Sequence, residues 1–144
     1  MWYSYATVRV VPRVERGEFL NVGVIVFARE QGFLAGRVEV DAARLLALAP
    51  DLDVGPVDRH LRTMLSVCAG EADGGPVAAL PAAERFHWLV APRSTVIQMS
   101  PVHVGRADDP ALALEELMAE LVRPASAAPG AGPAYRPDYE GAGA

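Results

Sequence analysis

The sequence predicts an α+β domain: an antiparallel β-meander of three strands, joined by a fourth strand, with helices packed on one face. Three observations carry this prediction. Period-2 patterns rich in β-branched residues fill residues 3–11, 19–29 and 33–40. Glycine-containing loops separate these segments, and helical apolar spacing dominates the middle of the chain and its later part.

Composition limits the classes of function open to the chain. Its 144 residues suit one domain, and its 13 basic residues are outnumbered by 18 acidic ones. The formal charge of −5 argues against nucleic acid as a partner. Every basic residue is arginine, which excludes a Walker phosphate loop, a Schiff-base lysine and the lysine of a protein kinase.

Cysteine and histidine usage predicts no disulfide, no metal site and no cofactor. Cys68 is the single cysteine, and the three histidines are scattered without a paired ligand spacing. No stretch approaches the roughly 20 apolar residues of a membrane span, and residues 1–11 lack the order of a secretory signal. We therefore expect a cytoplasmic protein that does not touch a membrane.

Two short loops set the predicted pairing of the three strands. Residues 15–17 and 30–32 each match a three-residue hairpin loop that ends in a left-handed glycine. With these loops, Val8 lies opposite Val24. We expect no bulge near Pro12, because a bulge there would turn Arg9 into the core.

This register predicts one apolar face and one mixed, polar face. The apolar face must be covered, so we place the helices there. Its members are Ala6, Val8, Val10, Val22, Val24, Val26, Gly36, Val38 and Val40.

Two helices are predicted directly after the meander. Asp41 is placed to cap a helix over residues 42–49, which Pro50 stops. Asp53 is placed to cap a longer helix that runs to Ala69, with Gly70 at its end. The longer helix is amphipathic, with an apolar stripe of Val54, Val57, Leu61, Met64, Leu65 and Cys68.

The rest of the domain is predicted less uniquely. Pro81 favours a helix over residues 82–90, although the alternation of apolar residues there also suits a strand. Residues 94–100 predict the fourth strand, whose position in the sheet stays open. Asp108 or Asp109 is placed to cap a final helix.

The polar sheet face holds the first candidate site. In the predicted register Arg9 and Glu39 flank Gly23, whose missing side chain leaves a furrow. A plain cross-strand ion pair is one interpretation, and a recognition surface for a protein is the other, because Arg and Tyr are enriched in binding hot spots. The candidate binding residues are Tyr5, Arg9, Asn21, Gly23, Arg37 and Glu39.

A second candidate site would bind a small ligand or a phosphate. Arg93 with Ser94 and Thr95 offers hydrogen bonds to an anion, and His87 and His103 are the nearest histidines in the sequence. A serine hydrolase has no support, because no Gly-x-Ser-x-Gly elbow occurs. We assign no catalytic residue.

Three stretches resemble a known family. They are YSYATVRVVP at residues 3–12, VERGEFLNVGVIVF at residues 14–27 and ERFHWLVAPRSTVIQMSPVH at residues 84–103. They resemble the bacterial family catalogued as domain of unknown function 3037, over about residues 3–123. The resemblance implies no established activity and no catalytic residue. It does imply a genomic neighbour, because similar proteins are often encoded beside a HipA-like kinase.

We therefore expect a single α+β domain over residues 1–123 and a disordered tail over residues 124–144. In the tail, 15 of 21 residues are Ala, Pro or Gly. The expected function is a non-enzymatic protein-interaction or accessory module, with a HipA-like kinase as the implied partner. The alternative is a small-ligand or phosphate-binding protein centred on Arg93, Ser94 and His87. An enzyme is one form that this alternative allows. Oligomeric state is not predicted.

Overall fold

The computed structural model describes residues 1–93 and 95–124. They form an antiparallel sheet with the strand order β3-β2-β1-β4, in which β5 also pairs with β1. The strands are β1 (Trp2–Val10), β2 (Leu20–Ala28), β3 (Phe33–Val38), β4 (Ile97–Met99) and β5 (His103–Arg106). The predicted α+β class and the three-strand meander are confirmed, and a fifth strand is added.

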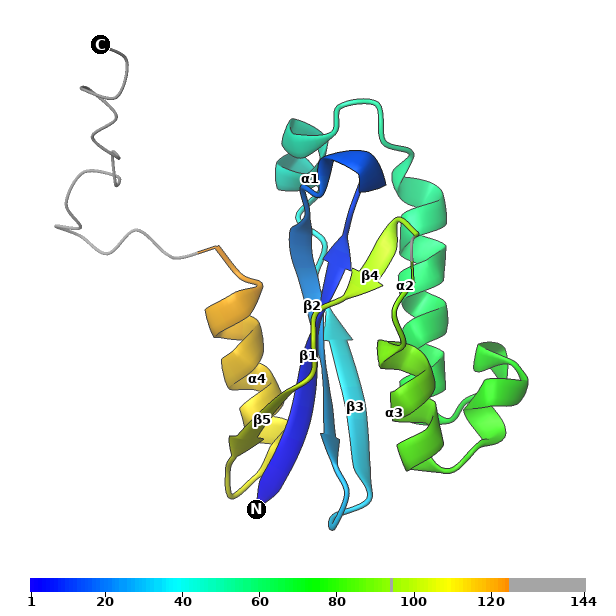
Figure 1. The fold of residues 1–144 in the computed structure, drawn as a ribbon, viewed down its shortest axis with the longest axis vertical. Coiled ribbons are helices and arrows are strands. Elements are labelled where there is room, and N and C mark those ends of the chain that lie inside the picture. Colours follow the sequence, from blue (N-terminus) through cyan, green and yellow to red (C-terminus); the bar gives the residue numbers. More distant parts are fainter. Residues whose placement is uncertain (94, 125–144) are drawn as a thin grey trace, which may run out of the picture.

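Helices cover the sheet from two sides (Figure 1). The helices are α1 (Ala42–Leu48), α2 (Val54–Ala69), α3 (Ala82–Val90) and α4 (Pro110–Leu121), with 3₁₀ turns at Val14–Arg16, Ala72–Gly74 and Pro76–Ala79. The helical alternative for residues 82–90 is the correct one. Side chains of Asp41, Asp53 and Asp109 accept backbone N–H groups at the starts of α1, α2 and α4, as predicted for helix caps.

β1 and β2 pair out of step with the prediction, by one residue up to Val8 and by two residues after it. Val8 lies opposite Gly23 rather than Val24, and a bulge follows. The expectation of no bulge is therefore wrong. The extra residue of the bulge, Val22, belongs to β2, so β1 keeps its alternation and Arg9 stays on the face opposite Val8.

The β2–β3 hairpin is also displaced by one residue, with Gly23 opposite Val38 instead of Glu39. The reason is the length of the loop. It spans residues 29–32, because the N–H of Gly32 donates to the carbonyl of the first loop residue at 3.1 Å. Four residues, not three, close this hairpin, so the pairing shifts and the predicted register is wrong.

The shift distributes the apolar residues over both faces of the sheet. Val24 and Ile25 are neighbours in sequence and point to opposite faces, yet they are only 0% and 2% exposed. A single core face is therefore the wrong picture. On one side Val8, Val10, Ile25 and Phe27 pack with α1, α2 and α3; on the other Val24 and Val26 pack with Leu114, Leu117, Met118 and Val122 of α4 and its end.

The prediction of helices on one face is corrected accordingly. α2 and α3 lie on one side of the sheet and α4 lies on the other (Figure 1). α4 covers the face that carries Tyr5, whereas Arg37 and Glu39 of the predicted polar face remain exposed. The candidate residues on that face have to be judged by what α4 brings to them.

Candidate functional site

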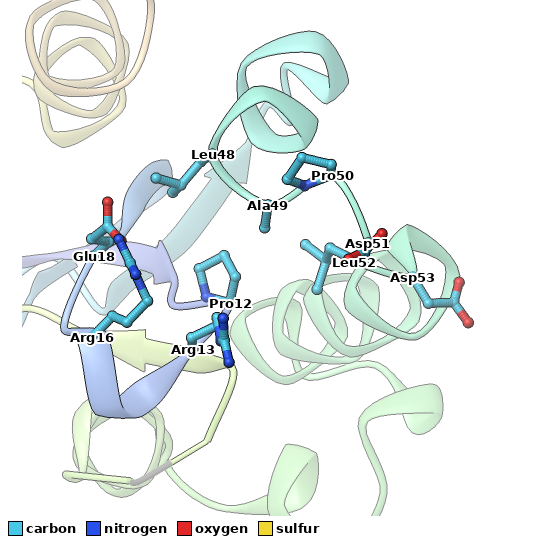
Figure 2. Close-up of a pocket in the computed structure, with 10 residues that line it drawn as sticks. All are labelled: Pro12, Arg13, Arg16, Glu18, Leu48, Ala49, Pro50, Asp51, Leu52 and Asp53. Atoms are coloured by element: carbon cyan, nitrogen blue, oxygen red, sulfur yellow. The ribbon is translucent and has the colours of Figure 1, made fainter.

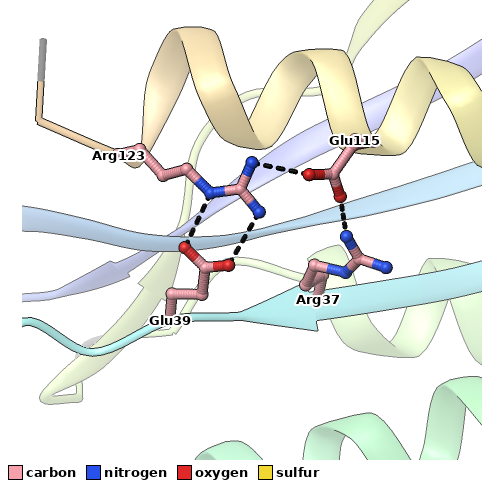
Figure 3. A network of polar contacts seen from close by, with 4 residues as sticks. All are labelled: Arg37, Glu39, Glu115 and Arg123. Atoms are coloured by element: carbon pink, nitrogen blue, oxygen red, sulfur yellow. Dashed lines mark hydrogen bonds and ion pairs between the residues drawn. The ribbon is translucent and has the colours of Figure 1, made fainter. Parts of the chain in front are cut away.

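Four charged residues join α4 to β3 (Figure 3). Arg123 donates to Glu39 through Nε at 2.9 Å and Nη2 at 2.8 Å, and its Nη1 donates to Glu115 at 2.6 Å. Glu115 also forms an ion pair with Arg37. The hydrogen bonds from Arg123 hold the pKa of Glu39 below its ordinary value. Glu39 therefore pairs with Arg123, not with Arg9 as the predicted furrow required.

Arg9 and Asn21 lie opposite each other on β1 and β2. Asn21 Nδ2 donates at 3.1 Å to the carbonyl of Leu121, one of the carbonyls that the end of α4 leaves open. The guanidinium of Arg9 lies 4.1 Å from the centroid of the Phe19 ring. Arg9 Nε and Asn21 Oδ1 are buried with no hydrogen-bond partner among the described residues. Of the predicted set, these two atoms still offer unmet hydrogen bonds.

Gly23 leaves no furrow on the polar face. It lies on the face that α2 covers, beside Val38. A Cβ atom at Gly23 would be 2.6 Å from the carbonyl oxygen of Arg37 and 3.0 Å from the Val38 side chain. The furrow predicted between Arg9 and Glu39 is wrong, and the one-residue shift in register is the cause.

One aromatic contact joins members of the two candidate sets. Tyr5 and His103 lie opposite each other on β1 and β5, with ring centroids 5.4 Å apart. The Tyr3 ring follows at 5.9 Å from Tyr5. Burial, with the nearby Tyr5 and two α4 carboxyl groups, raises the pKa of Tyr3. These rings pack at the margin of the core under α4.

Arg93 and Thr95 of the second candidate set are occupied by local contacts. Arg93 lies over the Trp88 ring at 4.4 Å and donates to the carbonyl of Trp88 at 2.7 Å. Thr95 Oγ1 donates to the carbonyl of Ile97 at 2.7 Å. Arg93 thus closes the end of α3, and Thr95 closes a turn before β4.

The histidines of the second set lie on different faces of the sheet. His87 is exposed on α3, whereas His103 contacts the Tyr5 ring on the face covered by α4. Ser94 lies outside the described residues. Ser100 accepts a backbone N–H from β1 and donates to the next carbonyl, each at 2.8 Å. The described members of the set therefore do not converge on one ligand position.

An open cleft of about 600 Å³ lies between the turn after β1 and the α1–α2 connection (Figure 2). Leu48 and Leu52 contribute apolar walls. Arg13 and Arg16 form ion pairs with neighbouring glutamates, and Asp53 points away from the hollow and caps α2. The volume suits a small ligand, but these charged groups are engaged locally.

Two titratable side chains outside these sets are held in their neutral forms. Burial raises the pKa of Cys68 to about 12, so its thiol is protonated near neutral pH. Burial and the charge of Arg93 lower the pKa of His60.

Within residues 1–93 and 95–124, no group of three or more His, Cys, Asp or Glu is placed to hold a metal ion. No helix in that part of the chain has the length and apolar character to cross a membrane.

The β5 end of the sheet exposes two large apolar side chains, Trp2 (62%) and Val104 (64%). Trp2 lies opposite Arg106, and Ser4 lies opposite Val104, so these side chains project from one face. The guanidinium of Arg106 lies 4.8 Å from the centroid of the Trp2 ring. We call Trp2, Val104 and Arg106 the edge patch.

The backbone beside the edge patch points away from the sheet. Met1 and Ala107 exchange hydrogen bonds of 2.9 and 3.0 Å. Hydrogen-bonded and non-hydrogen-bonded pairs alternate along an antiparallel ladder, so the N–H and C=O groups of Val104 and Arg106 face outward. Among the described strands β5 pairs only with β1, which leaves these groups on an open edge.

The sequence analysis missed the edge patch because it did not predict β5. A signal is present: Val102, Val104 and Arg106 alternate with other residues after Pro101. The run is short and ends in charged residues, so it reads as a loop. Trp2 precedes the predicted start of the first strand by one residue.

Together these features define a small α+β domain whose sheet is covered on both faces and whose outer strands β3, β4 and β5 each pair with one described strand. The chain belongs to a family of proteins of unknown function, DUF3037, whose model matches residues 5–122. This match confirms the family resemblance. No curated protein and no solved structure matches the chain.

Proposed function

We propose that this domain is a non-enzymatic protein-interaction module that docks a partner on the edge patch. The observation that supports this proposal is the exposure of Trp2 and Val104 side by side, with Arg106 over the Trp2 ring. Trp and Arg are among the residues most enriched in binding hot spots. Covering one large apolar side chain contributes about 1.5–3 kcal/mol, so Trp2 and Val104 would anchor an interface that extends beyond the patch.

The edge patch suits a partner better than the predicted polar sheet face does. α4 packs on that face, and Arg123 ties Glu39 to the end of the helix. A partner that used the buried Arg9 and Asn21 atoms would first have to displace α4. The edge patch is accessible without any such change.

The candidate partner is a HipA-like kinase, which the family resemblance implies as a genomic neighbour. An accessory protein that acts through docking needs no catalytic group of its own. The proposal therefore predicts a stable complex between the two purified proteins. It also predicts that this complex depends on the edge patch.

Calorimetric titration of the kinase with Trp2→Ala and Trp88→Ala tests the proposal. The two tryptophans are matched, because Trp88 is also exposed (40%) and also lies under an arginine, Arg93. Trp2→Ala should weaken binding by about 30-fold or more, the size of a hot spot. Trp88→Ala should leave the Kd within about twofold. Equal effects of the two substitutions would contradict the edge patch as the docking surface, and no complex at all would contradict the kinase as the partner.

A further inference from the structure

We infer that the β5 edge binds an extended, acidic segment of a partner chain, which adds to the sheet as a new strand beside β5. This inference rests on the proposed function and specifies its chemistry. Three features of the edge define the partner: free backbone groups, an apolar surface and an unpaired cation. Each of these three features limits the segment that fits.

The backbone groups require an extended partner. The outward N–H and C=O groups of Val104 and Arg106 lie two residues apart on one strand. An added strand meets this spacing with every second residue of its own, and each such pair exchanges two hydrogen bonds when the strands are antiparallel. A helix satisfies its own backbone groups and therefore cannot use the edge in this way.

The side chains around the edge require negative charge. Neither Arg106 nor Arg29 forms an ion pair with a carboxylate of the described chain, and each guanidinium instead lies near an aromatic ring. Exposed carboxylates are close in sequence, at Glu30 beside Arg29 and at Asp108 two residues after Arg106, but neither pairs with a guanidinium of the described residues. The acidic preference therefore rests on the unpaired guanidinium of Arg106 at the edge itself. An acidic segment gains attraction here that a neutral one lacks.

The same charges argue against a second copy of this chain as the occupant. The β5 sequence His103–Arg106 contains no carboxylate, so a copy paired edge to edge would offer none to Arg106. A partner segment with its own acidic residue supplies the carboxylate that a second copy lacks at this position.

The edge patch also sets the spacing within the segment. Val104 and Arg106 project from the same face, and Trp2 flanks them on β1. Side chains of an added strand alternate in the same way, so an apolar residue beside Val104 stands two positions from an acidic residue beside Arg106. The inferred motif is an apolar and an acidic residue in an i, i+2 relationship within a strand.

The test uses the full-length protein and a defined probe, the acetylated and amidated heptapeptide Thr-Glu-Thr-Val-Thr-Glu-Thr. Its central valine has an acidic residue two positions away in both directions, so it fits either strand orientation. The readout is the chemical shift and exchange rate of amide protons in the protein. We expect saturable binding with slowed exchange at Val104 and Arg106, whose amides point outward. The amides of His103 and Gly105 already bond to β1 and should change less.

Two altered peptides separate backbone pairing from other binding. N-methylation of the valine and both glutamates removes the donors, and lysine in place of both glutamates reverses the charge. Each should weaken binding at least about tenfold, because each removes one of the required features. Equal binding by the N-methylated peptide would overturn strand addition, and equal binding by the lysine peptide would overturn the acidic preference. No saturable binding by the parent peptide would overturn the inference as a whole.

A pair of protein variants completes the test. Val104→Pro and Val104→Ala both remove the valine side chain, but only proline also removes the outward N–H. Val104→Pro should bind the peptide at least about threefold more weakly than Val104→Ala. Equal affinities would contradict strand addition, and a doubled mass of the free protein in sedimentation would show that a second copy occupies the edge. Failure of the kinase to bind, with the peptide results as expected, would remove only the proposed partner.

Discussion

Arg123 binds the carboxylate of Glu39 with two hydrogen bonds of 2.9 and 2.8 Å, which join the end of α4 to the end of β3. The two residues are 84 positions apart in the sequence. Their contact, together with Glu115 and Arg37, closes the side of the sheet that the sequence analysis treats as an open face. The β5 edge, by contrast, combines outward backbone groups with the exposed side chains of the edge patch.

The Arg123 contact predicts how the Glu39 carboxyl titrates. Its pKa is lowered in the folded protein chiefly by the hydrogen bonds from Arg123, so Arg123→Met should raise that pKa toward the ordinary value of 4.5. A lowered folded pKa contributes stability above the unfolded pKa, and this contribution is lost as the pH falls through the folded pKa. Wild type should thus exceed the variant in stability at neutral pH and lose that advantage in acid.

Carbon-detected NMR titration of Glu39 measures this shift. Arg62→Met is the matched control, because Arg62 also pairs with a carboxylate, Asp58, but on the exposed side of α2. The control should leave the pKa of Glu39 unchanged. An unchanged pKa in Arg123→Met would show that the contact does not persist in solution.

A methyl group at Gly23 should destabilise the fold, although strands generally favour residues other than glycine. The Cβ of Gly23→Ala would be 2.6 Å from a backbone carbonyl oxygen of β3, which cannot move without opening the ladder. We expect a loss of about 1–3 kcal/mol in the free energy of unfolding, measured by urea titration.

Gly55→Ala is the control for Gly23→Ala. A Cβ at Gly55 would make only ordinary contacts of 3.4 and 3.6 Å in the first turn of α2. Alanine favours a helix by up to about 1 kcal/mol over glycine, so stability should hold or rise. Equal, small effects at both positions would mean that the β2–β3 register in solution is not the one described.

Both faces of the sheet should behave as core. Met118 packs under α4 at 0% exposure and Met64 packs under α2 at 3%. Met118→Ala and Met64→Ala should each lower the free energy of unfolding by about 2–5 kcal/mol. A loss below about 1 kcal/mol for Met118→Ala alone would show that α4 is peripheral and that one face suffices.

The C-terminal boundary is predicted from where the described packing ends. A chain that ends at Arg123 lacks the predicted tail and should melt within about 4 °C of the full chain, equivalent to under about 1 kcal/mol. A chain that ends at Glu120 also lacks Val122, which packs on the sheet, and Arg123, which binds Glu39. Its Tm should fall clearly further. A large loss for the first truncation would contradict a non-packing tail.

Local signals predicted the elements well. The caps at Asp41, Asp53 and Asp109 and the glycine at the end of α2 act within one turn of chain, so the sequence around them is sufficient. The left-handed glycine of the β2–β3 loop was predicted for the same reason. The chemistry of a turn is contained in the turn.

The register and the candidate site depend on longer distances. A three-residue and a four-residue loop ending in Gly32 both satisfy the turn motif, and the difference of one residue exchanges the two faces of the sheet. The partner of Glu39, Arg123, lies two residues beyond the end of α4, a helix that the sequence analysis wrongly placed on the same face as the other helices. The alternation of valines is the same whether one face of the sheet or both faces are covered. The position of α4 therefore follows only from the structure.

Hydrogen exchange of the domain alone and in complex with the proposed partner, a HipA-like kinase, tests the central claim most directly. The account predicts that complex formation slows exchange of the outward amides of Val104 and Arg106 and leaves the β3 amides near Glu39 unchanged. Protection on β3 and faster exchange in α4, with no change at β5, would contradict it. That result would mean that the partner displaces α4 and binds the sheet face beneath.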